Sequence, residues 1–81
     1  MHEWGITQDL INEVKIQAQA NNIKKITKVE ITLGKKSDLT AESLKLCFKA
    51  LATDEVLKGC KLRIKNTPDN KVILNKIEGK D

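Results

Sequence analysis

The first three residues, Met1, His2 and Glu3, carry the groups of this chain that are best suited to chemistry. The α-amine of Met1, the backbone nitrogen of His2 and the His2 imidazole can close adjacent chelate rings around one ion. Nitrogen donors in a square-planar or tetragonal arrangement suit Ni(II) and Cu(II). Glu3 can add a carboxylate oxygen or orient the imidazole from behind. The triplet therefore predicts a metal site, with Met1 contributing its amine rather than its thioether.

A histidine close to a chain terminus also has a simpler interpretation. Terminal residues are often poorly ordered, and His2 is then a solvated side chain without a partner. Cys47 and Cys60 do not offer a second metal site, because structural zinc needs four ligands and the sequence contains no CxxC pair. We expect these two cysteines to behave as small buried hydrophobic residues.

The remaining polar residues form no pattern that is typical of an enzyme. The glycines at positions 5, 34, 59 and 79 are isolated, so they do not build a phosphate-binding loop. Spacing suggests no Ser/His/Asp or Cys/His arrangement. Glu30 and Asp38 are lone carboxylates of the kind found on solvated surfaces. We therefore expect that the protein is not an enzyme.

Length and charge limit the other function classes. The 81 residues, with a formal net charge of +4, suit a single domain spanning residues 1–81 with a lysine-rich solvated surface. The sequence has no apolar run of membrane-spanning length and no signal-peptide pattern, so we expect a cytoplasmic protein without membrane contact. An RNA-binding sheet would interleave aromatic residues. We expect no nucleic-acid partner, because such residues are missing around the basic positions 24, 25, 35, 36, 61, 63 and 65.

Hydrophobic periodicity predicts the elements that must position the N-terminus. Residues 6–21 read as an amphipathic helix that ends at Asn21 and Asn22, with Trp4 before its first turn. Residues 27–33 alternate as a strand. Thr40 is the predicted N-cap of a second helix. A short helical turn at 53–58, a strand at 61–65, a turn at 67–70 and a third strand from residue 72, with a bulge near 75–76, complete the chain.

This order, α-β-α-β-β, predicts an α+β fold. The first two strands are joined through a helix, so they should pair in parallel with a right-handed connection. The last two strands should form an antiparallel hairpin. The result is a three-stranded mixed sheet with both helices packed on one face. Lys28, Lys61, Arg63 and Lys65 should then point outward from the other face.

Several segments together resemble the HypA/HybF family of nickel-incorporation proteins in hydrogenase maturation. They are the opening residues 1–8, the strand 28–34, the helix 42–48 and the segment 57–64. The resemblance covers nearly all of residues 1–67. It implies that Ni(II) binds through His2 with help from Met1 and Glu3. It also implies a maturation GTPase and the hydrogenase large subunit as partners, and in some cases a role in urease maturation.

The sequence departs from this family after the strand at 62–65. The family carries a second domain there, in which paired CxxC motifs hold structural zinc, and this chain has a turn at 67–70 instead. We therefore expect a nickel-binding domain without the zinc domain and without structural zinc. The alternative is a metal-independent interaction module of the same family with a vestigial nickel site. The sequence leaves the oligomeric state open.

Overall fold

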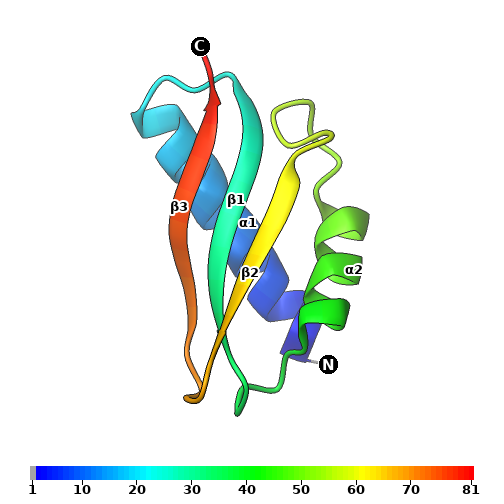
Figure 1. Cartoon of the computed structure of the whole chain (residues 1–81). Coiled ribbons are helices and arrows are strands. Elements are labelled where there is room, and N and C mark those ends of the chain that lie inside the picture. Colours follow the sequence, from blue (N-terminus) through cyan, green and yellow to red (C-terminus); the bar gives the residue numbers. More distant parts are fainter. Residues whose placement is uncertain (1) are drawn as a thin grey trace.

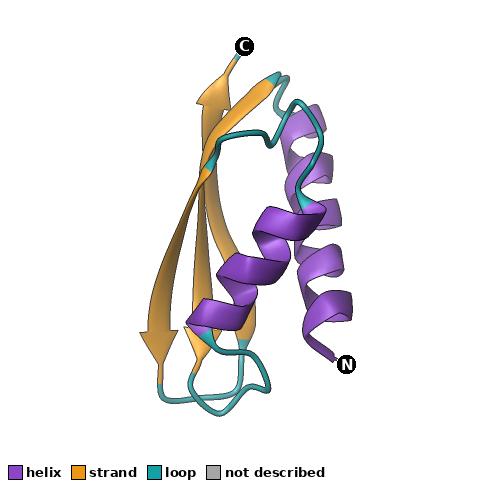
Figure 2. Cartoon of the chain, turned by 90° about the vertical axis from the view of Figure 1, so that its right-hand side faces the viewer, coloured by secondary structure: helices purple, strands orange, loops and turns teal. Residues whose placement is uncertain are grey.

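The computed structural model describes residues 2–81, and of His2 it describes the backbone only. The fold is α+β, with two helices and a three-stranded mixed sheet in the predicted order. Both helices lie on one face of the sheet (Figures 1 and 2). The elements are α1 (His2–Ala20), β1 (Lys25–Gly34), α2 (Ala41–Leu51), β2 (Lys61–Thr67) and β3 (Val72–Lys80).

Helix α1 begins earlier than the sequence predicted. The prediction placed Trp4 before the helix, but Trp4 lies within its first turn and is 42% exposed. The apolar period begins only at Ile6, but the helix also includes the residues before it, of which Trp4 and Gly5 are exposed. The end of α1 was predicted correctly. The helix stops at Ala20, and Asn22 adopts a left-handed conformation with a φ of 56°.

Helix α2 begins where the sequence predicted. The Thr40 hydroxyl accepts a hydrogen bond from the Ser43 backbone N–H at 3.0 Å, and the Ser43 hydroxyl accepts one from the Thr40 N–H at 3.1 Å. These reciprocal bonds form a capping box, which satisfies two backbone donors at the helix start. Leu39 and Leu44 on either side of the cap are both buried, as expected for a hydrophobic staple.

The segment after α2 does not form the predicted helical turn at 53–58. It folds as consecutive turns instead, in which the Leu57 N–H donates to Asp54 and the Cys60 N–H donates to Leu57. Gly59 does end the segment, with a φ of +79°. The Lys25 ammonium holds these turns by donating to the carbonyls of Glu55 at 2.9 Å and Lys58 at 2.6 Å.

The strand order is β2-β1-β3, which corrects the predicted hairpin. Strand β1 pairs in parallel with β2, as predicted, but β3 pairs antiparallel with β1 and not with β2. A short turn between consecutive strands usually signals a hairpin. Here β1 holds the most strongly buried strand residues, and the fold places it at the centre with a partner on each side. Figure 1 shows β1 between the two outer strands.

The connection from β2 to β3 therefore crosses over the end of β1. Two strand spacings amount to roughly 10 Å, which a short extended segment can span. Backbone N–H groups at the end of β1 and just after it bind the crossing segment. Gly34 donates to the Lys71 carbonyl at 2.7 Å, and Lys36, in the turn after β1, donates to the Asp69 carbonyl at 2.9 Å. The connection is thus tied to the central strand along its length.

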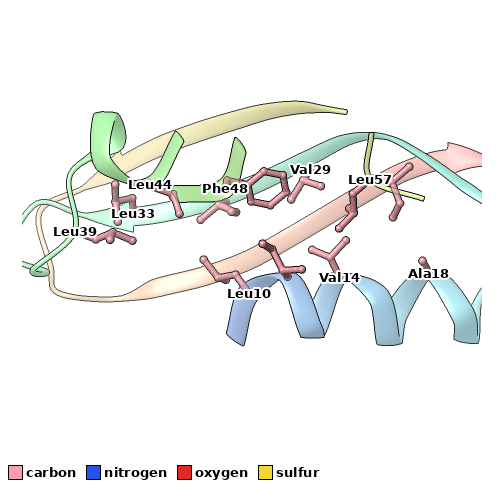
Figure 3. Close-up of a cluster of buried hydrophobic side chains, with 12 residues drawn as sticks. Leu10, Val14, Ala18, Val29, Leu33, Leu39, Leu44, Phe48 and Leu57 are labelled. Carbon is pink, nitrogen blue, oxygen red and sulfur yellow. The ribbon is translucent and has the colours of Figure 1, made fainter. Parts of the chain in front are cut away.

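The predicted irregularity in β3 is confirmed. The register passes from Glu30↔Lys76 to Ile31↔Leu74, so Asn75 is the extra residue of a bulge. The bulge preserves the inward orientation of the apolar residues on both sides of it. The hydrophobic core lies between the sheet and the helices. Figure 3 shows its labelled members, which come from both helices, β1 and the adjoining loops.

Candidate metal site

The core fixes the N-terminal part of α1 to the sheet. Thr7 and Val14 have no exposed surface and Ile11 is 1% exposed, so this face of the helix is packed from its second turn onward. Figures 1 and 2 place the start of α1 toward the end of the molecule where the β1–α2 and β2–β3 connections lie, away from the C-terminus. Whatever binds at the start of α1 is therefore presented at that end.

The predicted ligands fall only partly within the described residues. Met1 and the side chain of His2 lie outside them. The backbone of His2 is the first residue of α1, and Glu3 lies in the first turn with a partly exposed side chain. The structure therefore places Glu3 in the same turn as the start of the helix. How the three residues would arrange around a metal ion stays a prediction.

The start of a helix has two opposing effects on a bound cation. Its first backbone N–H groups have no acceptor within the helix, so a nitrogen there can become a metal ligand without breaking a helical hydrogen bond. However, the macrodipole places about half a positive charge at this end, which disfavours cations. The carboxylate of Glu3 lies in the first turn, where it offsets that charge.

The two cysteines are both free thiols in the structure. Cys47 is 4% exposed on the inner face of α2, as expected for a small hydrophobic residue. Cys60 is only partly buried, next to β2. Burial raises the pKa of the Cys60 thiol, and the positive charge of Lys25 acts against that increase. A raised pKa disfavours the thiolate that metals require.

Among the side chains that the structure describes, no three from histidine, cysteine, aspartate and glutamate gather closely enough to hold a metal ion. None of the helices within residues 2–81 is long and apolar enough to cross a membrane.

The predicted outward row of cations is confirmed on the open face of the sheet. Lys61, Arg63 and Lys65 are exposed along β2, and Lys28 of β1 is registered beside Lys61. Sequence reasoning treated these residues as a solvated surface only. It missed that the lysines of α2 and of the turns after it lie around a groove beside the same strand, because no periodic signal links them to β2. They are Lys45, Lys49 and Lys58.

Comparison with known proteins agrees with the small α+β domain described above. The model of the family "Hydrogenase/urease nickel incorporation, metallochaperone, hypA" matches residues 1–72. This match covers most of the chain, including the N-terminal triplet and every element except most of β3. The chain therefore belongs to the HypA family.

Individual relatives agree with this assignment. The chain is 38% identical over 64 residues to a hydrogenase maturation factor HypA of Chlorobium phaeobacteroides, covering 79% of this chain and 57% of that protein. It is 31% identical over 68 residues to the corresponding factor of Dehalococcoides mccartyi, covering 84% of this chain and 57% of that protein. This chain thus spans a little over half the length of these curated relatives.

A solved structure shares the fold. The solution structure of the Ni metallochaperone HypA from Helicobacter pylori superposes with a TM-score of 0.74. The match covers 91% of this chain and 70% of that one at 20% sequence identity. At this level of identity, the similarity concerns the arrangement of the helices and strands.

Proposed function

We propose that this chain is a nickel-binding metallochaperone, not an enzyme, that delivers Ni(II) during the maturation of [NiFe] hydrogenase. The observation that carries the proposal is the family match over residues 1–72, which includes the triplet Met1, His2 and Glu3. The donor chemistry supports it independently, since an amine, a backbone nitrogen and an imidazole form a set that suits Ni(II).

In the proposed site, His2 is the principal side-chain ligand. Met1 supplies its α-amine, and Glu3 supplies either a carboxylate oxygen or a hydrogen bond that orients the imidazole. The amine and imidazole bind as neutral groups, whereas a coordinating backbone nitrogen and the Glu3 carboxylate each carry one negative charge. These two negative charges together equal the charge of Ni(II), so the metal and its ligands are neutral as a group. A neutral group is not repelled by the partial positive charge at the start of the helix. Binding releases protons, so the affinity should fall in acid.

We also propose that residues 1–81 act as a nickel-binding domain without the zinc domain of the family. The sequence supports this, because the segment 68–71 joins β2 directly to β3 and holds no cysteine. Hydrogen bonds from Gly34, at the end of β1, and from Lys36, in the turn after it, fix that segment to this end of the sheet. Because β1 lies between β2 and β3, this segment crosses the end of β1 and does not close the expected hairpin. We therefore expect these bonds to hold the crossing together without structural zinc.

The partners that the family implies are a maturation GTPase and the hydrogenase large subunit. A cytoplasmic location fits partners of this kind. The alternative is a metal-independent interaction module. It has the same fold, but Met1, His2 and Glu3 bind no nickel. It predicts that a His2→Ala variant still co-purifies normally with those partners.

A calorimetric Ni(II) titration tests the proposed site. The protein with a native Met1 terminus is compared with the same protein carrying one extra N-terminal residue, which removes the α-amine from the chelate. We expect one-to-one binding at about micromolar Kd for the native terminus and its loss on extension. His2→Ala should abolish tight binding while the circular dichroism spectrum stays unchanged. Equal or absent binding in the native and extended forms would rule out the terminal chelate and favour the interaction module.

A further inference from the structure

Strand β2 has an outer edge that pairs with no other strand within residues 2–81. It is the first strand in the order β2-β1-β3 and extends from Lys61 to Thr67. The N–H and C=O groups along such an edge are available to a further strand. Three cations line the open face of this edge strand, namely Lys61, Arg63 and Lys65. Glu30 of β1 stands beside Arg63 in the register and offsets part of its charge.

A groove lies beside the start of this edge strand, on the helix side of the sheet. It lies between α2 and the start of β2, and the turns after α2 close one end. The side chains that line its floor are mainly apolar: Phe48, Ala52, Leu57 and Leu62. Three exposed lysines border it, at positions 45, 49 and 58. The edge of β2 thus has a row of cations on one side and an apolar groove with a cationic border on the other.

We propose that this edge binds an extended segment of a partner protein in which acidic and apolar residues alternate. Such a segment would add to the sheet as a fourth strand beside β2. Successive side chains of a strand point to opposite faces. The acidic residues would then lie beside Lys61, Arg63 and Lys65. The apolar residues would face the helix side, and those beside Leu62 would enter the groove. Opposite charges directly across neighbouring strands stabilise the pairing.

The charge distribution disfavours a second copy of this chain as the occupant. Pairing β2 with β2 of another copy would place the two cationic rows against each other, and like charges opposite one another destabilise a sheet. Nucleic acid fits less well than a peptide, because the groove is mainly apolar and the cationic row has no aromatic side chain between its members on which bases could stack.

A binding assay with a designed peptide tests the proposal. The probe is a fluorescein-labelled peptide with the seven-residue length of β2, in which valine and glutamate alternate. We expect binding by fluorescence anisotropy, with amide shifts in the nuclear magnetic resonance spectrum at residues 61–67 and along α2. A peptide with lysine in place of glutamate should not bind.

Two further peptides test whether the segment pairs with β2 as a strand. One carries N-methyl groups on its valines and the other on its glutamates. Only alternate N–H groups face β2, so one of them should lose binding and the other should keep it.

Charge reversal on the protein supplies the matched control. Lys61→Glu with Lys65→Glu should weaken peptide binding at least about tenfold, because like charges then face each other across the interface. Lys24→Glu with Lys80→Glu changes the net charge equally at two exposed positions on the β3 side of the sheet, away from β2, and we expect its effect to stay within about twofold. Equal weakening in both double variants would overturn the proposal.

Other outcomes would also overturn it. The proposal fails if the valine–glutamate peptide does not bind or if both methylated peptides bind fully. It also fails if sedimentation shows dimerisation through β2, or if the protein binds an RNA oligonucleotide in preference to the peptide. The assay is run without nickel and with His2→Ala as a second background. Its result is therefore independent of the proposed metal site.

Discussion

The backbone carbonyl of Asp69 lies directly against the Cα of Gly34. A Cβ at position 34 would overlap the Asp69 oxygen, so the crossing between β2 and β3 can lie this close only over a glycine. The Gly34 N–H also donates to the Lys71 carbonyl at 2.7 Å. The strand predicted at 27–33 stops just before Gly34. The structure shows that Gly34 also contacts the crossing segment at the end of the sheet.

Replacing Gly34 by alanine should therefore destabilise the fold. The clash is with backbone, which moves less easily than a side-chain end, and we expect a loss of about 2–3 kcal/mol in the free energy of unfolding. Urea denaturation measures it. Gly5→Ala is the control, because a Cβ there meets no atom within 4 Å. Gly5 lies in α1, so the same change should stabilise by up to about 1 kcal/mol. An equal loss in both variants would contradict the contact role of Gly34.

The Asp69 carboxylate should titrate below its ordinary value. It accepts hydrogen bonds from the Lys71 N–H at 3.0 Å and the Thr67 hydroxyl at 2.9 Å, and these bonds lower its pKa from 3.8. A lowered folded pKa stabilises the fold above pH 3.8, and this contribution is lost as the pH falls through the folded pKa. Carbon-13 titration of the carboxyl group measures the value. Thr67→Val should move it back toward 3.8, and an unchanged value would remove the hydroxyl from the explanation.

The capping box makes Thr40 important for α2. Thr40→Ala removes the acceptor of the Ser43 N–H, and we expect a loss of about 1 kcal/mol in unfolding free energy. Thr53 stands at the start of the predicted helical turn at 53–58, which the structure does not contain. Thr53→Ala should therefore change stability by less than about 0.5 kcal/mol. A comparable loss at Thr53 would indicate a cap where the structure has none.

Lys25 should stabilise the turns that lead into β2. Lys25→Met removes two bonds to the carbonyls of Glu55 and Lys58, and we expect a cost of about 1–2 kcal/mol. The same change should raise the pKa of the Cys60 thiol further, because the Lys25 charge acts to lower it. Urea denaturation and the alkylation rate of Cys60 in a Cys47→Ala background measure the two effects. Lys24→Met, at the exposed neighbouring position, should leave both nearly unchanged.

Glu3 should strengthen nickel binding if the proposed site is used. Glu3→Gln removes the negative charge from the first turn of α1 and leaves the helix dipole less compensated. An effect of about 0.3–1 kcal/mol corresponds to a roughly two- to fivefold weaker Kd. Glu13→Gln changes the same charge in the middle of the helix and should leave the Kd unaltered. A Kd unchanged by Glu3→Gln would exclude Glu3 from the site.

The sequence by itself determined the elements and much of their packing. The apolar period of residues 10–18 gave the buried face of α1, Thr40 gave the start of α2, and the imperfect alternation near Asn75 gave the bulge. These features depend on local hydrogen bonds or on a period of a few residues, so they can be read along the chain. The terminal chelate is also a local prediction, since its donors are consecutive.

Only the tertiary structure decided how the strands are ordered. The turn after Thr67 is compatible with a hairpin, and what prevents one is the competition for the two edges of β1. That choice depends on contacts between residues far apart in the sequence, such as Gly34 with Asp69. The same non-local packing brings the lysines of α2 beside β2 and creates the groove. A short stretch of sequence does not show which strands pair, because the pairing depends on how all the elements pack together around the core.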